Sequence, residues 1–461
     1  MEVMTSRYKI IIEELSEGGP GGYESTYLTS EGSPASEELY EILDGFKGGL
    51  LPASARVIRQ RNGEALVKAL QDGKPVGIAS GFKPSGAYHF GHRLASSAVA
   101  FFQKNGAQIF MPVADIECDM DTKISREQYR FWAADNLLDW GANGVNLDAT
   151  HVYLQSEEIR VNTLAYFVAR SLKLELAIDI YGIEKMVKDF PFLFAGVTQV
   201  GDIILPQHND FGNYHSFMVS GQDQDGHMKM TVALTEDSLK NGIAQLGVKT
   251  IPSGFYIPHI RGISGDKASS SKAEGTLYLG SGPQQEDLDD RIKSTLSKFD
   301  AADREQLERC ALDMVRFIDV FNRESRVDFT EAAQTQKYKE LVKRLDDASR
   351  QEQQEVQAEL DGFLISFCQD KGQNNIEIVR DSLPEALREH QKRRKTILEY
   401  ANERELYFDR LENGLNLLCD TEKPIQPEFW KVPECAVVDQ DKRNQTRWFD
   451  IVHSAADRII P

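Results

Sequence analysis

The sequence predicts an α/β protein in which a doubly wound parallel sheet is followed by an α-helical domain. Two observations support this prediction. Between residues 76 and 240, short apolar segments alternate with longer segments whose apolar residues recur every three or four positions, as expected for strands alternating with helices. After about residue 295 the strand-like segments fade and long amphipathic patterns follow. The 461 residues are enough for two or three domains, each with its own core.

The central strands are predicted from four apolar segments: Val76–Ala79, Ala107–Ala114, His151–Leu154 and His215–Ser220. Helices are expected after each strand, over Gly91–Lys104, Ser125–Leu138 and Val161–Leu172 and again beyond residue 224. Ser125 is the expected cap of its helix because a serine hydroxyl can accept a backbone N–H there. This alternation favours a Rossmann-like sheet.

These patterns divide the chain into four parts. Residues 1–75 are an N-terminal extension, with a Gly/Ser/Glu-rich connection over Ser16–Ser36 and a helix near Gly63–Asp72. Residues 76–295 are the Rossmann-like domain, and residues 403–461 are an appended segment, irregular or helical. Residues 296–402 are the helical domain, with helices expected over Arg304–Arg323, Gln336–Phe367 and Pro384–Arg404.

Composition and charge predict a cytoplasmic protein. Lysine and arginine total 53 and aspartate and glutamate total 72, which gives a net charge of −19 and argues against coating nucleic acid by bulk charge. The sequence has no apolar run of about 18 residues and no basic start followed by an apolar core, so neither a membrane span nor a signal peptide is expected. The five cysteines lack CxxC spacing, which predicts reduced thiols rather than disulfides or a metal site.

Two histidines, His89 and His92, with Gly91 between them, form the most informative short motif. They follow the predicted strand Val76–Ala79 and a loop that begins at Gly81, and they precede a predicted helix. A helix N-terminus offers unpaired N–H groups and a positive dipole end to phosphate, and imidazoles can donate to phosphate oxygens. Because Gly91 has no side chain, an adenine or ribose could approach the backbone. The motif predicts a nucleotide site; the alternative is a pair of helix-capping histidines without a ligand.

A second motif lies nearly two hundred residues downstream, where Lys267 precedes three serines, Ser269, Ser270 and Ser271. A lysine on a Gly/Ser loop is a mobile cation that can neutralise a leaving pyrophosphate. Alone the loop says little, since such loops are usually only solvated. Its position downstream of the histidine motif indicates that the two are halves of one ATP site.

This ordered pair resembles the HxGH and KMSKS-like signatures of class I aminoacyl-tRNA synthetases. The surrounding sequence is most similar to the tryptophanyl-tRNA synthetase family in its archaeal and eukaryotic form. The resemblance runs from about residue 54 to 295, and more weakly to about 402. Besides Gly81–His92, the segments that carry it are Ala114–Glu117, Ile180–Gly182, Thr198–Ile203, Gly221–His227, Thr276–Leu279 and Glu389–Arg394.

The resemblance implies a ligase that activates tryptophan with ATP and transfers the aminoacyl group to the 2′-hydroxyl at the 3′ end of a tRNA. It implies Mg²⁺ bridging the phosphates, a homodimer, and an anticodon-binding role for the helical domain. The residues expected to bind ATP are Gly81, His89, Gly91, His92, Lys267, Ser269, Ser270 and Ser271, among which His89, His92 and Lys267 are the catalytic candidates. No protein-held metal site is expected.

The resemblance also implies an amino-acid pocket lined by Ala79, Gln199, Asp223 and Gln224. The Asp223 carboxylate and the two amide oxygens are acceptors suited to a substrate ammonium. The substrate carboxylate is already a nucleophile at neutral pH, so attack on the α-phosphorus needs no general base. Without the resemblance, Gln199 would be read as an ordinary buried amide between helices.

Several residues depart from the family pattern. Ala79 stands where relatives commonly carry a tyrosine, and Leu176 stands where they usually carry a polar pocket residue. Gly226 replaces a proline, and Ala268 replaces a methionine. Ala79 and Leu176 would make the pocket larger or less polar. Because an indole N–H buried without an acceptor costs about 1–3 kcal/mol, these departures concern the choice of amino acid more than adenylation.

Three alternatives remain open. A diverged paralogue would activate another amino acid or use aminoacyl-tRNA in specialised metabolism. A tyrosyl-tRNA synthetase would share Gln199–Asp202, although Gly221–His227 favours tryptophan. A non-catalytic tRNA-binding protein would have no need of Lys267 or the two histidines. A basic run, Gln391–Lys395, could meet the tRNA backbone or form a solvated helix face.

Overall fold

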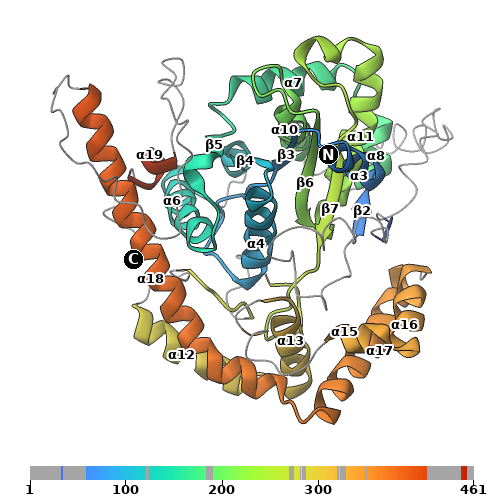
Figure 1. Cartoon of the computed structure of the whole chain (residues 1–461), viewed down its shortest axis with the longest axis vertical. Helices are drawn as coiled ribbons and strands as arrows, with labels where there is room; N and C mark the ends of the chain where they lie inside the picture. The colour runs from blue at the N-terminus through green and yellow to red at the C-terminus, as the bar shows by residue number, and fades with distance from the viewer. Residues whose placement is uncertain are drawn as a thin grey trace, which may run out of the picture.

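The protein is described from a computed structural model (Figure 1). The residues that it describes are 33–34, 59–120, 124–182, 190–268, 275–280, 282, 287–318, 321, 329–347, 350–412 and 448–453. Ser269, Ser270 and Ser271 lie outside these ranges, as does the glycine-rich connection apart from residues 33–34.

The centre of the structure is a seven-stranded sheet in the order β1-β2-β7-β6-β3-β4-β5. Its strands are β1 (Ser33–Pro34), β2 (Arg59–Arg61), β3 (Val76–Ala79), β4 (Gln108–Val113), β5 (Thr150–Leu154), β6 (His215–Gly221) and β7 (Ser253–Ile257). The five strands from β7 to β5 are mutually parallel, which confirms the predicted doubly wound α/β class. The sequence did not predict the two edge strands β1 and β2, which add an antiparallel edge beside β7.

Successive side chains of the parallel strands enter different cores, as the two-residue period of a strand requires. Ile78 and Phe217 belong to the largest apolar cluster, whereas Ala79 and Met218, their neighbours, belong to a separate small cluster. Ala79 pairs with Met218 on β6 and with Phe110 on β4. The end of β3 therefore faces the side of the sheet where the cleft described below lies.

Helices cover both faces of the sheet (Figure 1). Helices α3 (Gly63–Gln71), α4 (Phe90–Lys104) and α6 (Arg126–Ala142) contribute to the largest apolar cluster on one face. Helices α7 (Ile159–Ala169), α8 (Leu174–Tyr181), α10 (Phe190–Ile204) and α11 (Asp225–Lys240) surround the second cluster on the other. Shorter pieces are α5 (Asp115–Met120) and 3₁₀ turns at Leu147–Ala149, Leu205–Gln207, Gln222–Gln224 and Ile243–Leu246.

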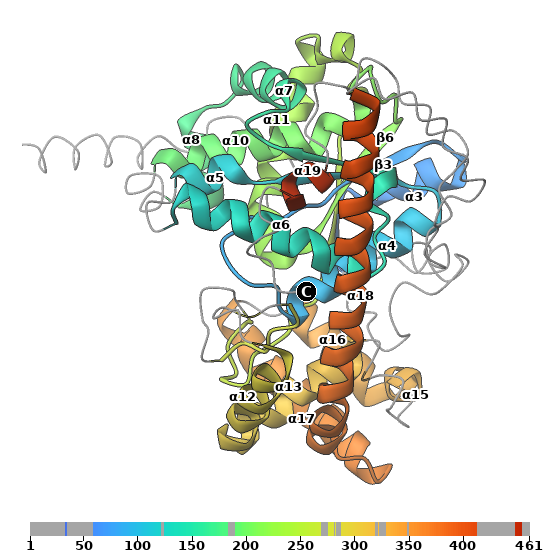
Figure 2. The same ribbon diagram turned by 90° about the vertical axis from the view of Figure 1, so that its left-hand side faces the viewer.

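From Leu288 onward, the regular elements in the part of the chain that the structure describes are all helices. Its helices are α12 (Leu288–Ala301), α13 (Arg304–Phe317), α15 (Phe329–Gln334), α16 (Gln336–Asp347), α17 (Arg350–Asp370), α18 (Asn375–Glu412) and α19 (Trp448–His453). Figure 2 shows α18 running from the helical region up beside the α/β region, with α19 against its upper part. Trp448 Nε1 of α19 donates to Asp148 Oδ1 over 3.0 Å, so part of the C-terminal segment packs on the α/β region.

Three predicted helices differ in extent from the observed ones. The helix expected over 304–323 ends at Phe317, and the segment 336–367 contains two helices, α16 and α17. Pro384 was expected to begin a helix but lies inside α18. A proline costs a backbone hydrogen bond there, and burial of Val379, Leu383 and Leu387 on the same helix offsets this cost.

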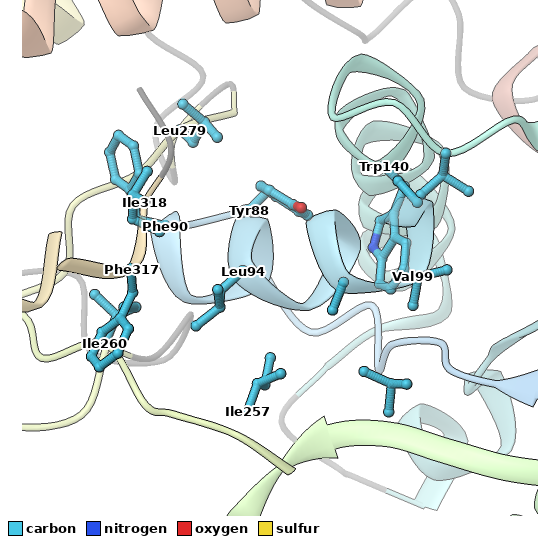
Figure 3. Packing of buried hydrophobic residues seen from close by; sticks show 14 of the residues in the cluster. Tyr88, Phe90, Leu94, Val99, Trp140, Ile257, Ile260, Leu279, Phe317 and Ile318 are labelled. Atoms are coloured by element: carbon cyan, nitrogen blue, oxygen red, sulfur yellow. The ribbon is translucent and has the colours of Figure 1, made fainter. Parts of the chain in front are cut away.

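The first turns of α4 bind the α/β region to the helical region. Phe90 and Leu94 belong to the same buried cluster as Leu279, Phe317 and Ile318 (Figure 3). The Phe90 N–H donates to the Leu277 carbonyl over 3.4 Å, and the Leu279 N–H donates to the Tyr88 carbonyl over 3.0 Å. The backbone before His89 is therefore fixed by the segment that follows the lysine loop. Among the described helices, none is long and apolar enough to cross a membrane.

Candidate functional site

A cleft of about 480 Å³ opens at the carboxyl ends of β3 and β6, against the N-terminus of α4 and the helix α10. The predicted site residues that line it are Ala79, Gly81, His89, Gly91, His92, Gln199, Asp223, Gln224 and Lys267. Residues up to 188 positions apart in sequence, from Ala79 to Lys267, thus meet around one space. In an open α/β sheet, this edge is where ligands bind.

The two histidines form a stacked pair at the start of α4. His89 is the N-cap: its Nδ1 accepts the Gly91 N–H over 3.1 Å, and its own N–H donates to His92 Nδ1 over 3.4 Å. The ring centroids are 3.8 Å apart, with 23° between the ring planes. The two histidines therefore do cap α4, as the alternative interpretation expected. Both side chains also line the cleft, so capping does not exclude a role in binding.

Both imidazoles are neutral near pH 7. Burial, with the nearby charge of Lys267, lowers the pKa of His92 to about 4, and burial together with His92 and Lys267 holds the pKa of His89 well below its ordinary value. A neutral imidazole carries one N–H. Because each Nδ1 accepts a backbone N–H, the proton of each ring resides on Nε2. The pair therefore offers two neutral N–H donors to an anionic ligand.

Two glycines of the motif are required by close approaches within the protein. A Cβ at Gly91 would lie 2.9 Å from the His89 ring, so Gly91 leaves room for the capping imidazole. A Cβ at Gly81 would lie 1.9 Å from the Pro112 carbonyl oxygen of β4. Glycine at position 91 is therefore needed to accommodate the capping His89 ring, in addition to the expected space for a nucleotide.

Lys267 reaches the cleft from the opposite side and pairs with Asp223. The Lys267 Nζ donates to Asp223 Oδ2 over 2.7 Å, and His259 Nε2 lies 3.4 Å from Asp223 Oδ1. Burial would raise the pKa of Asp223, but the hydrogen bond and charge of Lys267 outweigh it, so this pKa is below its ordinary value. Asp223 is therefore an anion at neutral pH, available to cations on the cleft side.

Three of the four predicted amino-acid residues, Ala79, Gln199 and Gln224, lie on the other wall of the cleft. Gln199 Nε2 donates to Gln224 Oε1 over 3.4 Å, and Ala79 closes the end of β3 with 3% of its surface exposed. Ala195, Ile203 and other apolar side chains complete this wall. The arrangement combines an apolar chamber with amide groups at its entrance, which suits a ligand with an apolar side chain and a polar head.

Asp202 lies in the same wall and was not predicted as a site residue. Its carboxylate accepts hydrogen bonds from Tyr153 Oη (2.9 Å) and Gln155 Nε2 (2.6 Å), and 1% of its surface is exposed. Burial, partly offset by these donors, raises its pKa to about 7. The sequence signal was its position three residues after Gln199 on α10, which places both on one helix face.

Other cleft residues also escaped prediction. Phe192, His227, His259 and Lys83 line the cleft. His227 and Phe192 lie beside Tyr181, whose hydroxyl is 3.0 Å from His227 Nδ1. His227 had a partial signal in the sequence, because it ends the Gly221–His227 segment. Phe192 had none, because one aromatic residue in an apolar helix is indistinguishable from core.

Two interpretations need correction. Leu176, expected near the pocket, lies in the second apolar cluster with Val200 and does not line the cleft. Arg394, expected on a solvated or tRNA-facing basic surface, is fully buried. It donates to Asp139 Oδ1 over 2.7 Å and forms a second ion pair with Asp135. Both carboxylates come from α6, so Arg394 attaches α18 to the α/β region.

The described residues contain no group of three or more His, Cys, Asp or Glu side chains that could hold a metal ion. The carboxylates that line the cleft are also already engaged: Asp223 pairs with Lys267, Glu117 pairs with Lys83, and Asp202 accepts from Tyr153 and Gln155. The described donor set therefore does not fit a protein-held cation.

Known proteins resemble this chain in sequence and in fold. The family model described as class I tRNA synthetases (W and Y) matches residues 71–364. Proteins named tryptophan–tRNA ligase from Hyperthermus butylicus and Methanopyrus kandleri are 30% and 29% identical over 230 and 234 residues, which are 48% and 50% of this chain and 58% and 59% of those proteins. The chain thus spans about six tenths of the length of these relatives.

Solved structures give the same fold. The tryptophanyl-tRNA synthetase of Aeropyrum pernix matches with a TM-score of 0.53 and 22% identity, over 73% of this chain and 83% of that one. A product-bound parasite tRNA synthetase matches with a TM-score of 0.54 and 14% identity, over 84% of this chain and 93% of that one. At these identities the likeness shows the fold.

Proposed function

This chain belongs to the class I tRNA synthetases (W and Y), and from that premise we propose that it activates tryptophan with ATP and transfers the aminoacyl group to the 3′ end of a tRNA. The observation that carries the proposal is the pair of neutral imidazoles, His89 and His92, in one cleft with the Lys267 ammonium. Neutral donors on one wall and a cation on the other suit a polyphosphate.

In the proposed first step, the tryptophan carboxylate attacks the α-phosphorus of ATP. A bond forms between the carboxylate oxygen and phosphorus, and the bond to the leaving pyrophosphate breaks. The Nε2–H groups of His89 and His92 would donate to phosphate oxygens, and Lys267 would neutralise charge that develops on the pyrophosphate. Since the nucleophile is already anionic, the residues act by placing the reactants and neutralising charge.

ATP use follows from the family, and Mg²⁺ is part of the proposal. Since the described side chains form no metal-binding group, the ion would arrive coordinated by the phosphates of ATP.

The amino acid would lie against Ala79 and α10. Its ammonium would meet Asp223, Gln199 and Gln224, and its side chain would enter the chamber near Ala79. Asp202 can accept an indole N–H as readily as a phenolic O–H. This residue therefore supports an aromatic substrate with a polar edge. It does not distinguish tryptophan from tyrosine.

The tRNA, the homodimer and the cytoplasmic location belong to the proposal as well. Ile159 and Tyr166 lie seven residues apart on one face of α7, and 71% and 75% of their surfaces are exposed. Exposed apolar side chains grouped on one helix face are typical of a subunit interface. A second copy of the chain is the partner proposed for this face.

A diverged paralogue is the second candidate, favoured by Ala79. Ala79 lines the cleft at a position where relatives commonly carry a tyrosine. Because alanine is much smaller than tyrosine, this position leaves room for a different or larger substrate.

Amino-acid-dependent exchange of pyrophosphate into ATP, measured across the standard amino acids, distinguishes these candidates. We expect exchange with tryptophan, and charging of total tRNA with tryptophan. Exchange only with another amino acid would support the paralogue, and absence of exchange from folded protein would overturn the proposal.

A further inference from the structure

The lysine loop begins on a short hairpin. Arg261 lies directly opposite Lys267 in an antiparallel bridge. Backbone hydrogen bonds flank this pair, and the bond from the Ala268 N–H to the Ile260 carbonyl is 2.9 Å long. Because the bridge joins the two backbones, the position of Lys267 depends on that of Arg261.

The Arg261 side chain points away from the cleft into the helical region. Its Nε and Nη2 donate to the two oxygens of Asp313 over 2.7 and 2.6 Å, and its backbone N–H donates to Asp313 Oδ2 over 3.0 Å. Its Nη1 donates to Asp361. Asp313 lies on α13 and Asp361 on α17, and they are 5% and 2% exposed. One guanidinium thus attaches the hairpin to two helices.

The far side of the loop returns to the same hairpin. The Ile263 N–H donates to the Gly275 carbonyl over 2.8 Å, so the residue after the undescribed part of the loop is fixed beside Arg261. The Lys267 Nζ meanwhile extends into the cleft to Asp223. A shift of α13 or α17 would therefore move Lys267 through one rigid connection.

We propose that Arg261 is a positioning residue, which Asp313 and Asp361 hold so that Lys267 reaches the phosphates of ATP. The proposal deepens the proposed function and rests on it for the role of Lys267. It also gives the helical region an effect on adenylation, since α13 and α17 set the position of the catalytic lysine. A bidentate arginine suits this task because its planar fork fixes direction as well as distance.

A double-mutant cycle tests the connection. Asp313→Asn weakens the hold on Arg261 with little change of volume, and we expect it to lower kcat of ATP–pyrophosphate exchange about 10- to 100-fold, with a smaller change in KM. In a Lys267→Ala background the same substitution should have no further effect, since the group that it positions is gone. If Asp313→Asn lowered kcat by the same factor with and without Lys267, the proposal would be overturned, and Asp313 would have only a structural role.

The matched control is Arg380→Met, which removes an exposed arginine–carboxylate pair between α18 and α12, two helices that do not hold Arg261. It should leave exchange unchanged. Arg261→Met is the stronger variant, but it leaves two buried carboxylates unpaired, so its folding is checked by thermal unfolding. Asp361→Asn provides a second mild variant, and Asp313→Glu should recover part of the activity by keeping the charge.

A readout without activity separates this proposal from the function on which it rests. In hydrogen-exchange mass spectrometry, Asp313→Asn should raise exchange in the peptide covering residues 260–268, whereas Arg380→Met should not. Unchanged protection in Asp313→Asn would overturn the proposal even if the wild-type protein is active. Absence of pyrophosphate exchange in the wild type would instead overturn the proposed function.

Discussion

The Lys267 ammonium donates to the Asp223 carboxylate over 2.7 Å, so the residue expected to meet pyrophosphate is paired with the residue expected to meet the substrate ammonium. An ionised carboxylate has about four lone-pair sites, so Asp223 can accept from a substrate ammonium while it keeps the hydrogen bond from Lys267. The pair therefore connects the amino-acid side of the cleft with the phosphate side.

Replacing Asp223 with Asn should raise KM for tryptophan about tenfold or more. A hydrogen bond to a charged group contributes about 1.5–3 kcal/mol, and the substrate ammonium would lose such a bond. Pyrophosphate exchange at varied tryptophan concentration measures the change. Asp289→Asn, at an exposed carboxylate on α12, is the control, and an unchanged KM in Asp223→Asn would refute the assignment.

His92→Ala should lower kcat of exchange by about 100-fold or more, because a donor to the transition state is removed. Since the pKa of His92 is about 4, the ring stays neutral from pH 6 to 9 and the wild-type rate should show no inflection from this group. A pH profile of kcat checks this expectation. An inflection near pH 6.5 that disappears in His92→Ala would show that the charged ring takes part.

Asp202 should make stability depend on pH. Its pKa, raised by burial to about 7, exceeds the unfolded value of about 4, so the folded state holds the proton more tightly. The stabilising contribution is complete below about pH 4 and is lost as pH rises through 7. The difference in unfolding free energy between Asp202→Asn and the wild type should therefore increase in favour of the variant as pH rises from 5 to 8. Urea denaturation at a series of pH values measures this difference. A constant difference over this range would contradict the assignment.

Arg394→Met should destabilise the protein by about 3–5 kcal/mol, since it removes the arginine that pairs with the buried carboxylates of Asp135 and Asp139. Arg380→Met is the control: its pair with Asp300 joins α18 to α12 at the surface, and about 0–1 kcal/mol is expected there. Urea denaturation measures both. Similar losses in the two variants would show that burial of the Arg394 pair has little energetic effect.

The sequence predicted those features whose causes are local. Ser125 caps α6, and its Oγ accepts the Gln128 N–H over 3.2 Å, as the capping signal indicated. His89 and His92 could be identified because their chemistry depends on a helix start and a spacing of three. Lys267 was predicted from a loop pattern together with its order along the chain.

The rest required contacts between distant residues. Arg394 and Asp139 are 255 positions apart, and a basic run on a helix looks the same whether its members are solvated or buried. Arg261 follows a strand without any motif of its own, and its partners lie 52 and 100 residues away. The antiparallel edge strands were missed because three residues, as in β2, are too few to show a period.

Because neighbouring side chains at the end of β3 have different surroundings, substitutions at neighbouring positions have different effects. Ile78 is buried in the main core, Ser80 Oγ donates to the Val219 carbonyl over 2.8 Å, and Ala79 between them borders the cleft. A substitution at Ala79 can alter which side chain enters the chamber without displacing the histidines or the lysine. Under the proposed function, substrate choice could thus change at this strand end while the residues assigned to ATP, His89, His92 and Lys267, stay the same.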